Sequence, residues 1–257
     1  YLGERLLPDA AETVAAIRTA GARVAFLTNK PLERPATYAA KLSKLGIEAG
    51  PSEVVSSTDA LLRYLERHAT GARILPITEP LLADMLREAG FTTVDPATDD
   101  PTSADVVVVA WDRTFDYAKL VAAFRAVRAG ARIVATNPDP FCPMPDGDLP
   151  DCAAMLAAIE ASTGASAEAV VGKPSAHMAA ALLERMDMAP EETVLVGDRL
   201  LTDVRMGQAA GMATALVLTG ATTFADLAGA PLQPDFVLAG VAQVLPVDPS
   251  TAQETRP

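Results

Sequence analysis

Polar residues follow four apolar runs of this sequence, at the positions where strands would end. They are Thr28 with Asn29, Lys173, Asp198 and Thr219. A hydroxyl group and a cation can bind phosphoryl oxygens, and a carboxylate can bind a divalent metal ion. If these runs are strands of parallel sheets, the pattern predicts a site for phosphoryl transfer that uses a divalent metal.

A second carboxylate, Asp203, follows Asp198 by five positions. Each of these residues also has a purely structural interpretation when it is taken alone. A Thr or Asp after a strand is often the N-cap of the next helix, and a single lysine such as Lys173 is commonly a solvated surface residue. Only their combination at successive strand ends favours the catalytic interpretation.

Apolar periodicity predicts an alternation of helices and strands along almost the whole chain. The expected helices span residues 8–20, 35–45, 58–68, 80–89, 117–129, 152–162, 175–186 and 202–210. The expected strands span residues 24–27, 54–57, 73–77, 92–94, 105–110, 133–135, 193–196, 214–218 and 236–238, with a proline-rich loop over 138–150. Such alternation predicts an α/β fold with parallel sheets, whose ligands bind beyond the carboxyl ends of the strands.

Composition and charge exclude several classes of protein. The chain has 257 residues, a formal net charge of −12 and 50% hydrophobic residues. An excess of acidic residues repels a phosphate backbone, so nucleic-acid binding is disfavoured, although local cations can still hold a small phosphate. We find no apolar run long enough to span a bilayer and no signal segment, and we expect a cytoplasmic protein that does not bind membranes. Two cysteines, Cys142 and Cys152, are too few for a disulfide framework or a structural zinc site.

Three short motifs resemble, in order, motifs II, III and IV of the haloacid dehalogenase (HAD) superfamily. They are FLTNK at 26–30, VGKPS at 171–175 and GDRLLTD at 197–203. The segments ATNPD at 135–139 and TALVLTG at 214–220 extend the similarity over essentially the whole chain. These flanking segments are similar to the NagD-like branch of the superfamily, subfamily IIA.

The resemblance implies roles for five residues. The Thr28 hydroxyl and the Asn29 backbone amide would bind the transferring phosphoryl oxygens. Lys173 would neutralise charge between the nucleophilic carboxylate and the phosphoryl group. Asp198 would ligate Mg²⁺, and Asp203 would complete the metal site through its water shell or orient Lys173.

The resemblance also implies a division of the chain into two domains. A Rossmann-like HAD core with a parallel sheet would comprise residues 1–70 and 168–257, and residues 71–167 would form an inserted α/β cap of the C2 type. In the cap, Asn137, Asp139 and Asp112 would contact the substrate. The alternative for all three is turn chemistry, because Asn-Pro-Asp-Pro forms turns whatever the function.

The cap departs from the family pattern in places that bear on substrate choice. Ile77 and Pro80 stand where relatives usually have glycines, and Leu149–Ala153 replaces a Pro-Gly-x-Gly stretch. The form of residues 151–155 is closer to the sugar-phosphatase members than to the phosphoglycolate ones. Trp111 follows an apolar strand and belongs either to the core of the cap or to a wall of the substrate pocket.

One family motif is missing from this sequence. The nucleophile of the family and its acid/base partner lie in an Asp-x-Asp-Gly motif at the end of the first strand, just before the position of Tyr1. The chain contains no such motif, since Asp146-Gly147-Asp148 lies in the proline-rich loop. Independently, the first predicted element is a helix with no strand before it, so the sheet is expected to lack its first strand. We expect the motif to lie upstream of Tyr1; the alternative is a degenerate member that has lost it.

These observations predict a Mg²⁺-dependent phosphatase that acts through a phosphoaspartyl intermediate. Its substrate would be a small phosphorylated metabolite, such as a sugar phosphate, phosphoglycolate or a nucleotide. The alternatives are a catalytically inactive phosphate-binding domain and a phosphotransferase that uses the same site. The resemblance also allows a homodimer.

Overall fold

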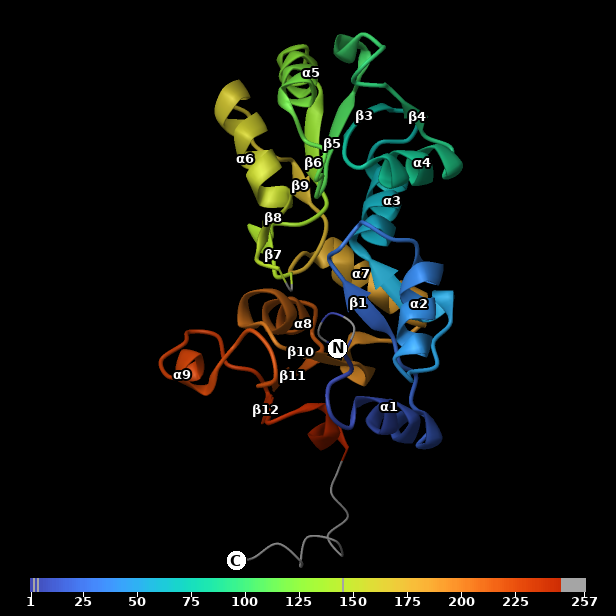
Figure 1. Cartoon of the computed structure of the whole chain (residues 1–257), viewed down its shortest axis with the longest axis vertical. Helices are drawn as coiled ribbons and strands as arrows, with labels where there is room; N and C mark the ends of the chain where they lie inside the picture. Colours follow the sequence, from blue (N-terminus) through green and yellow to red (C-terminus); the bar gives the residue numbers. More distant parts are fainter. Residues whose placement is uncertain (2, 4, 145, 246–257) are drawn as a thin grey trace, which may run out of the picture.

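The computed structural model describes residues 1, 3, 5–144 and 146–245. Figure 1 shows two units stacked end to end, each made of sheet and helices. They are called here the upper layer and the lower layer, and the N-terminus lies in the lower one. The helices are α1 (Ala10–Thr19), α2 (Pro35–Lys44), α3 (Ser57–His68), α4 (Pro80–Glu88), α5 (Tyr117–Arg128), α6 (Cys152–Thr163), α7 (Ala176–Met186), α8 (Arg205–Ala209) and α9 (Phe224–Leu227). No helix in this described part of the chain combines the length and the apolar character needed to cross a membrane.

The upper layer in Figure 1 is a five-stranded parallel sheet in the order β4-β3-β5-β6-β9. Its strands are β3 (Arg73–Ile77), β4 (Thr92–Thr93), β5 (Val106–Val109), β6 (Arg132–Ala135) and β9 (Ala169–Val170). The four valines of β5 are fully buried, as expected for a central strand of a parallel sheet that is covered on both faces. The fifth strand, β9, lies beyond residue 167, so the sheet extends three residues past the end expected for the cap.

The lower layer in Figure 1 contains two further pieces of parallel sheet. One piece pairs β1 (Phe26–Thr28) with β2 (Val54–Ser56), and the other has the order β10-β11-β12, formed by Val194–Gly197, Ala213–Val217 and Phe236–Leu238. Among the described residues no ladder joins β1 to β10. The expectation of an α/β fold with parallel sheets is confirmed.

Local sequence explains where the helices that flank the site begin. Ser56 accepts a hydrogen bond from the Asp59 backbone amide, and the Asp59 carboxylate accepts one from the Ser56 amide, so a capping box starts α3. Ser175 caps α7 through the backbone amides of His177 and Met178. The cap of α7 lies two residues beyond Lys173, in a motif that was predicted to carry a site residue.

Two features differ from the expectations. Inside the expected loop over 138–150, β7 (Phe141–Cys142) pairs antiparallel with β8 (Leu149–Pro150). The sequence did not predict this hairpin, because two-residue strands are too short to show alternation. The helix expected over 202–210 is also interrupted: a π-helical turn over Leu200–Val204 precedes α8, which changes the direction in which Asp203 projects.

One apolar cluster joins the two layers. It includes Leu65 of α3 and Met178 of α7 from the lower layer, together with Ile74, Val106 and Val134 of the upper sheet, all of them buried. Because this cluster is continuous, each layer contributes to the stability of the other.

We expect the substitution Leu65→Ala to lower the free energy of unfolding by about 2–5 kcal/mol, because it leaves a cavity where a fully buried side chain packs. The matched control Leu201→Ala removes a side chain that is 62% exposed and should change stability by less than about 0.5 kcal/mol. Denaturant unfolding of both variants measures the difference. Equal effects would contradict a core that spans the layers.

Candidate active site

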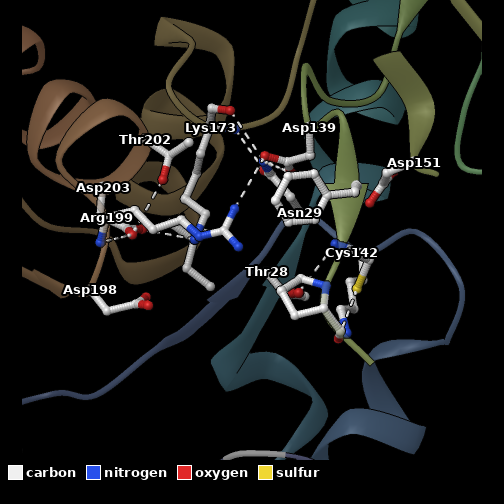
Figure 2. Close-up of a pocket in the computed structure, with 14 residues that line it drawn as sticks. Thr28, Asn29, Asp139, Cys142, Asp151, Lys173, Asp198, Arg199, Thr202 and Asp203 are labelled. Carbon is white, nitrogen blue, oxygen red and sulfur yellow. Dashed lines mark hydrogen bonds and ion pairs between the residues drawn. The ribbon is translucent and has the colours of Figure 1, made fainter. Parts of the chain in front are cut away.

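A cavity of about 150 Å³ lies where the two layers meet. Figure 2 shows its side chains, with Asp198 and Asp203 on one side and Asp151 on the other. The residues that line it are Leu27, Thr28, Asn29, Lys30, Asp139, Phe141, Cys142, Pro143, Asp151, Lys173, Asp198, Arg199, Thr202 and Asp203. The structure therefore brings together Thr28, Asn29, Lys173, Asp198 and Asp203, which come from three separate motifs.

The side chain of Asn29 connects the segments that surround this cavity. Its Oδ1 atom accepts a hydrogen bond from the Lys173 backbone amide at 2.7 Å, and its Nδ2 atom donates to the Lys173 carbonyl at 3.1 Å. The same Nδ2 atom donates to Asp139 Oδ2 at 2.9 Å. Ser57 Oγ donates to the Asn29 carbonyl at 2.6 Å. One buried carboxamide thus connects the end of β1 to the segment after β9 and to the inserted sheet.

Lys173 and Asp203 form a shielded ion pair. Lys173 Nζ lies 2.8 Å from Asp203 Oδ1, and the side chains are 16% and 7% exposed. The second oxygen of Asp203 accepts from the Arg199 backbone amide at 3.3 Å and from Thr202 Oγ1 at 3.4 Å. A Cβ atom at Gly197 would overlap the Asp203 carboxylate, so only glycine allows this approach. Both oxygens of Asp203 are engaged within the protein, and the carboxylate fixes the ammonium group.

Asp198 presents one open carboxylate oxygen. Its Oδ2 atom accepts from the Ala221 amide at 2.7 Å, whereas Oδ1 accepts no hydrogen bond from the described residues. Gly220 packs so closely against this carboxylate that a Cβ atom would overlap it. Among the residues that the structure describes, no group of three or more His, Cys, Asp or Glu side chains could hold a metal ion. Because Mg²⁺ commonly takes one or two carboxylates together with substrate phosphate and water, one open carboxylate fits that ion.

Two of the residues expected to contact substrate, Asp139 and Asn137, differ in whether they line the cavity. Asp139 lines the cavity, and its Oδ1 atom lies 3.8 Å from an Arg199 nitrogen. Asn137 is fully buried behind the cavity, and its Nδ2 atom donates to the Asn29 carbonyl at 3.1 Å. Asn137 and Asp139 therefore connect the two layers, whatever contacts they make with a substrate.

The structure does not bring Asp112 or Thr219 to this cavity. The Asp112 side chain is fully buried in the upper layer and forms an ion pair with Lys119. The Lys119 ammonium also donates to the Thr78 carbonyl and to Thr114 Oγ1. Asp112 thus acts as a structural anchor, because its carboxylate is directed toward a cation inside its own layer.

Trp111 belongs to the core of the upper layer. It is 2% exposed, packs in the apolar cluster of that layer and does not line the cavity. Lys30 lies 5.9 Å from the centre of its ring, so the indole supports a cation that does line the cavity. Of the two alternatives for Trp111, the structure favours the core.

Sequence reasoning did not single out Asp151 as a site residue. It lies at the N-cap of α6, lines the cavity and is 3% exposed. Burial, assisted by the charge of Asp139, raises the pKa of Asp151 to about 6. The available signal was the replacement of the family's Pro-Gly-x-Gly stretch at 149–153, which marked this segment as unusual without showing which side chain faces the cavity.

Known proteins resemble this chain over most of its length. Residues 1–92 match the family described as haloacid dehalogenase-like hydrolase, and residues 170–244 match a second family described as HAD-hydrolase-like. The chain is 35% identical to sugar-phosphatase AraL of Bacillus subtilis (strain 168), covering 95% of this chain and 88% of AraL. It is 33% identical to ribonucleotide monophosphatase NagD of Escherichia coli (strain K12), covering 93% and 91% respectively.

Solved structures show the same likeness. The p-nitrophenyl phosphatase from Archaeoglobus fulgidus superposes with a TM-score of 0.86 at 30% identity, covering 95% of this chain and 94% of the other. The chain therefore belongs to the haloacid dehalogenase-like hydrolases. Within that family it is a member of the NagD-like branch, subfamily IIA.

We expect Asn29→Asp to lower the free energy of unfolding by about 1–3 kcal/mol, because a carboxylate cannot donate to Asp139 or to the Lys173 carbonyl. Adding Asp139→Asn restores a donor opposite the new acceptor and should recover part of the loss. Denaturant unfolding of the two single variants and the double variant measures this coupling. Additive losses would contradict a direct contact between the two side chains.

We expect Asp151→Asn to stabilise the protein above pH 6. The ordinary pKa of this carboxyl is 3.8, and the raised value of about 6 means that folding disfavours its ionised form. The cost develops between pH 4 and 6 and reaches about 3 kcal/mol above pH 6, while a neutral amide avoids it. The stability of the variant relative to the natural chain should therefore rise over this range and then level off.

The control for this pH dependence is Asp148→Asn, which removes an exposed carboxylate from the same segment. It should change stability by less than about 0.5 kcal/mol at pH 4 and at pH 7. Thermal or denaturant unfolding at several pH values distinguishes the two variants. A constant difference between Asp151→Asn and the natural chain would show that the buried carboxyl does not titrate in this range.

Proposed function

We propose that this HAD-type phosphatase hydrolyses phosphate monoesters of small metabolites with Mg²⁺, through an aspartyl-phosphate intermediate. The observation that carries the proposal is the convergence of Thr28, Lys173 and Asp198 on one cavity. These residues supply a hydroxyl donor, a cation and an open carboxylate oxygen, which together suit a phosphoryl group and a divalent metal. Sugar phosphates, phosphoglycolate and nucleotides are all candidate substrates.

The residues of this chain would bind and neutralise the phosphoryl group. The Thr28 hydroxyl and the Asn29 backbone amide donate to its oxygens, and the Lys173 ammonium offsets its charge. Asp203 positions that ammonium through the 2.8 Å ion pair. Asp198 would hold Mg²⁺, which supplies further charge neutralisation when it is bound.

The covalent step requires a nucleophile, which we place in an Asp-x-Asp-Gly motif upstream of Tyr1. The first aspartate would bond to phosphorus as the bond to the leaving oxygen breaks, and the second would give its proton to that oxygen. The second aspartate would then take a proton from the water that hydrolyses the aspartyl phosphate, releasing inorganic phosphate. The cavity lies beyond Thr28 of β1 and Gly197 of β10, two strands that are not joined to each other in the described residues.

The upper layer supplies part of the lining of this cavity. Because it contributes Asp139, Phe141, Cys142, Pro143 and Asp151, we assign to it the cap role of choosing the leaving alcohol.

We expect Asp198→Ala and Lys173→Ala each to lower kcat/KM for p-nitrophenyl phosphate by at least about 100-fold in the full-length protein with Mg²⁺. Asp198→Ala removes the open metal-binding oxygen, and Lys173→Ala removes the cation. Lys44→Ala, an exposed lysine on α2, is the matched control and should keep full activity. Release of inorganic phosphate measures all four proteins.

Full activity in both site variants would refute the proposal. Phosphate binding without turnover by the unchanged full-length protein would favour the phosphate-binding domain instead. Transfer of the phosphoryl group to an added alcohol in preference to water would favour a phosphotransferase. Reading the codons upstream of Tyr1 tests the location of the nucleophile, because the proposal requires paired aspartates there.

A further inference from the structure

The cap side of the cavity contains a buried carboxyl group that the proposed hydrolysis does not use. Asp151 Oδ1 accepts from the Cys152 backbone amide at 2.6 Å and from Asn137 Nδ2 at 3.4 Å. Its Oδ2 atom accepts no hydrogen bond from any described residue, although the residue is 3% exposed and lines the cavity. The residue is mostly buried, but this oxygen is not sealed from the cavity, so a donor that enters the cavity can reach it.

The other carboxylate on the cap side is already engaged. Asp139 receives a hydrogen bond from Asn29 and lies close to Arg199. Asp151 therefore provides the open acceptor on this side of the cavity, across from Asp198 and Asp203 in Figure 2. It belongs to the side of the cavity that the upper layer lines, to which the proposed function assigns the leaving alcohol.

An aromatic ring accompanies this carboxyl group. Phe141 of β7 lines the cavity and remains 45% exposed, so its ring is available to a ligand. An acceptor oxygen beside an accessible aromatic face matches an alcohol that has both hydroxyl groups and C–H faces. It does not match an alcohol with a carboxylate, which would meet the negative charge of Asp151 at short range.

Two charged groups face Asp151 besides its own helix N-terminus. Asp139 raises the pKa of the Asp151 carboxyl, and Lys30 lowers it. Burial is the largest cause of the change in this pKa, and Lys30 has the smallest effect. Lys30 also lines the cavity and is the cation among these two groups. The thiol of Cys152 is neutral at ordinary pH, because burial raises its pKa to about 11.

We propose that Asp151 determines the leaving group, by accepting hydrogen bonds from the hydroxyl groups of polyol or sugar phosphates and by disfavouring esters that carry a carboxylate. The inference rests on the proposed phosphatase function and narrows its substrate class. It assigns to one side chain a choice between sugar-type and phosphoglycolate-type substrates. The phosphoryl-binding residues take no part in that choice.

The test is a selectivity ratio in the full-length protein with Mg²⁺. It compares kcat/KM for ribose 5-phosphate and glycerol 3-phosphate with kcat/KM for 2-phosphoglycolate and 3-phosphoglycerate, with p-nitrophenyl phosphate as a reference ester. Asp151→Asn should lower the polyol-to-carboxylate ratio at least about tenfold, since the neutral amide no longer repels a substrate carboxylate and replaces one of the two acceptor oxygens by a donor. Asp151→Ser, which keeps an N-cap residue on α6, should lower it in the same direction and serves if the amide variant folds poorly.

The control Asp148→Asn removes the same charge from an exposed position of the same segment and should keep the ratio within about twofold of the natural value. Lowering the pH through about 6 should also lower the ratio in the natural protein, as Asp151 gains a proton, and leave it constant in Asp151→Asn. The ratio removes the titration of the phosphate itself, which all of the esters share.

Three outcomes would overturn the inference. An unchanged ratio in both Asp151 variants would show that the carboxyl does not discriminate between leaving alcohols. An equal loss in Asp148→Asn would show that overall charge is responsible. Absence of turnover even for p-nitrophenyl phosphate would overturn the proposed function and this inference together, whereas turnover of that ester with an unchanged ratio overturns the inference alone.

Discussion

The arrangement of the site depends on the hydrogen bonds made by the Asn29 carboxamide. This carboxamide accepts from one backbone group of Lys173, donates to another and donates to Asp139. No other side chain except glutamine offers an acceptor and two donors on one planar group, and glutamine would place them one methylene farther out. The same buried residue thereby sets the position of Lys173 and the approach of the upper layer.

Charges around the cavity are arranged so that most of them are satisfied within the protein. Asp203 holds Lys173, and Asp139 lies near Arg199. The carboxylates with an open oxygen, Asp198 and Asp151, stand on opposite sides of the cavity. In a chain with a net charge of −12, this pairing keeps cations at the cavity without making the whole surface basic.

Short-range patterns predicted most of the elements, and motif resemblance singled out five residues that line one cavity in the structure, Thr28, Asn29, Lys173, Asp198 and Asp203. The apolar run of β5 and the polar residues after β1 and β10 are visible in a few consecutive positions. The link between Asn29 and Asp139 is not, because 110 positions separate them and either residue alone is an ordinary turn former. Asp112 was wrongly expected at the cavity for a related reason. It follows a strand as Asp198 does, but its ion pair with Lys119 keeps it inside its own layer, and the sequence pattern does not show that pair.

The hairpin of β7 and β8 contributes to the cavity while carrying little of the fold. Each strand is two residues long, and Phe141 and Leu149 remain partly exposed. Substitutions there cost less free energy than substitutions in the sheets, because few buried contacts are lost. This segment can therefore change between related proteins at less cost to the fold than the strands on the opposite side of the cavity. One ancestral hydrolase could in this way give rise to descendants that share a reaction and differ in the metabolite they consume.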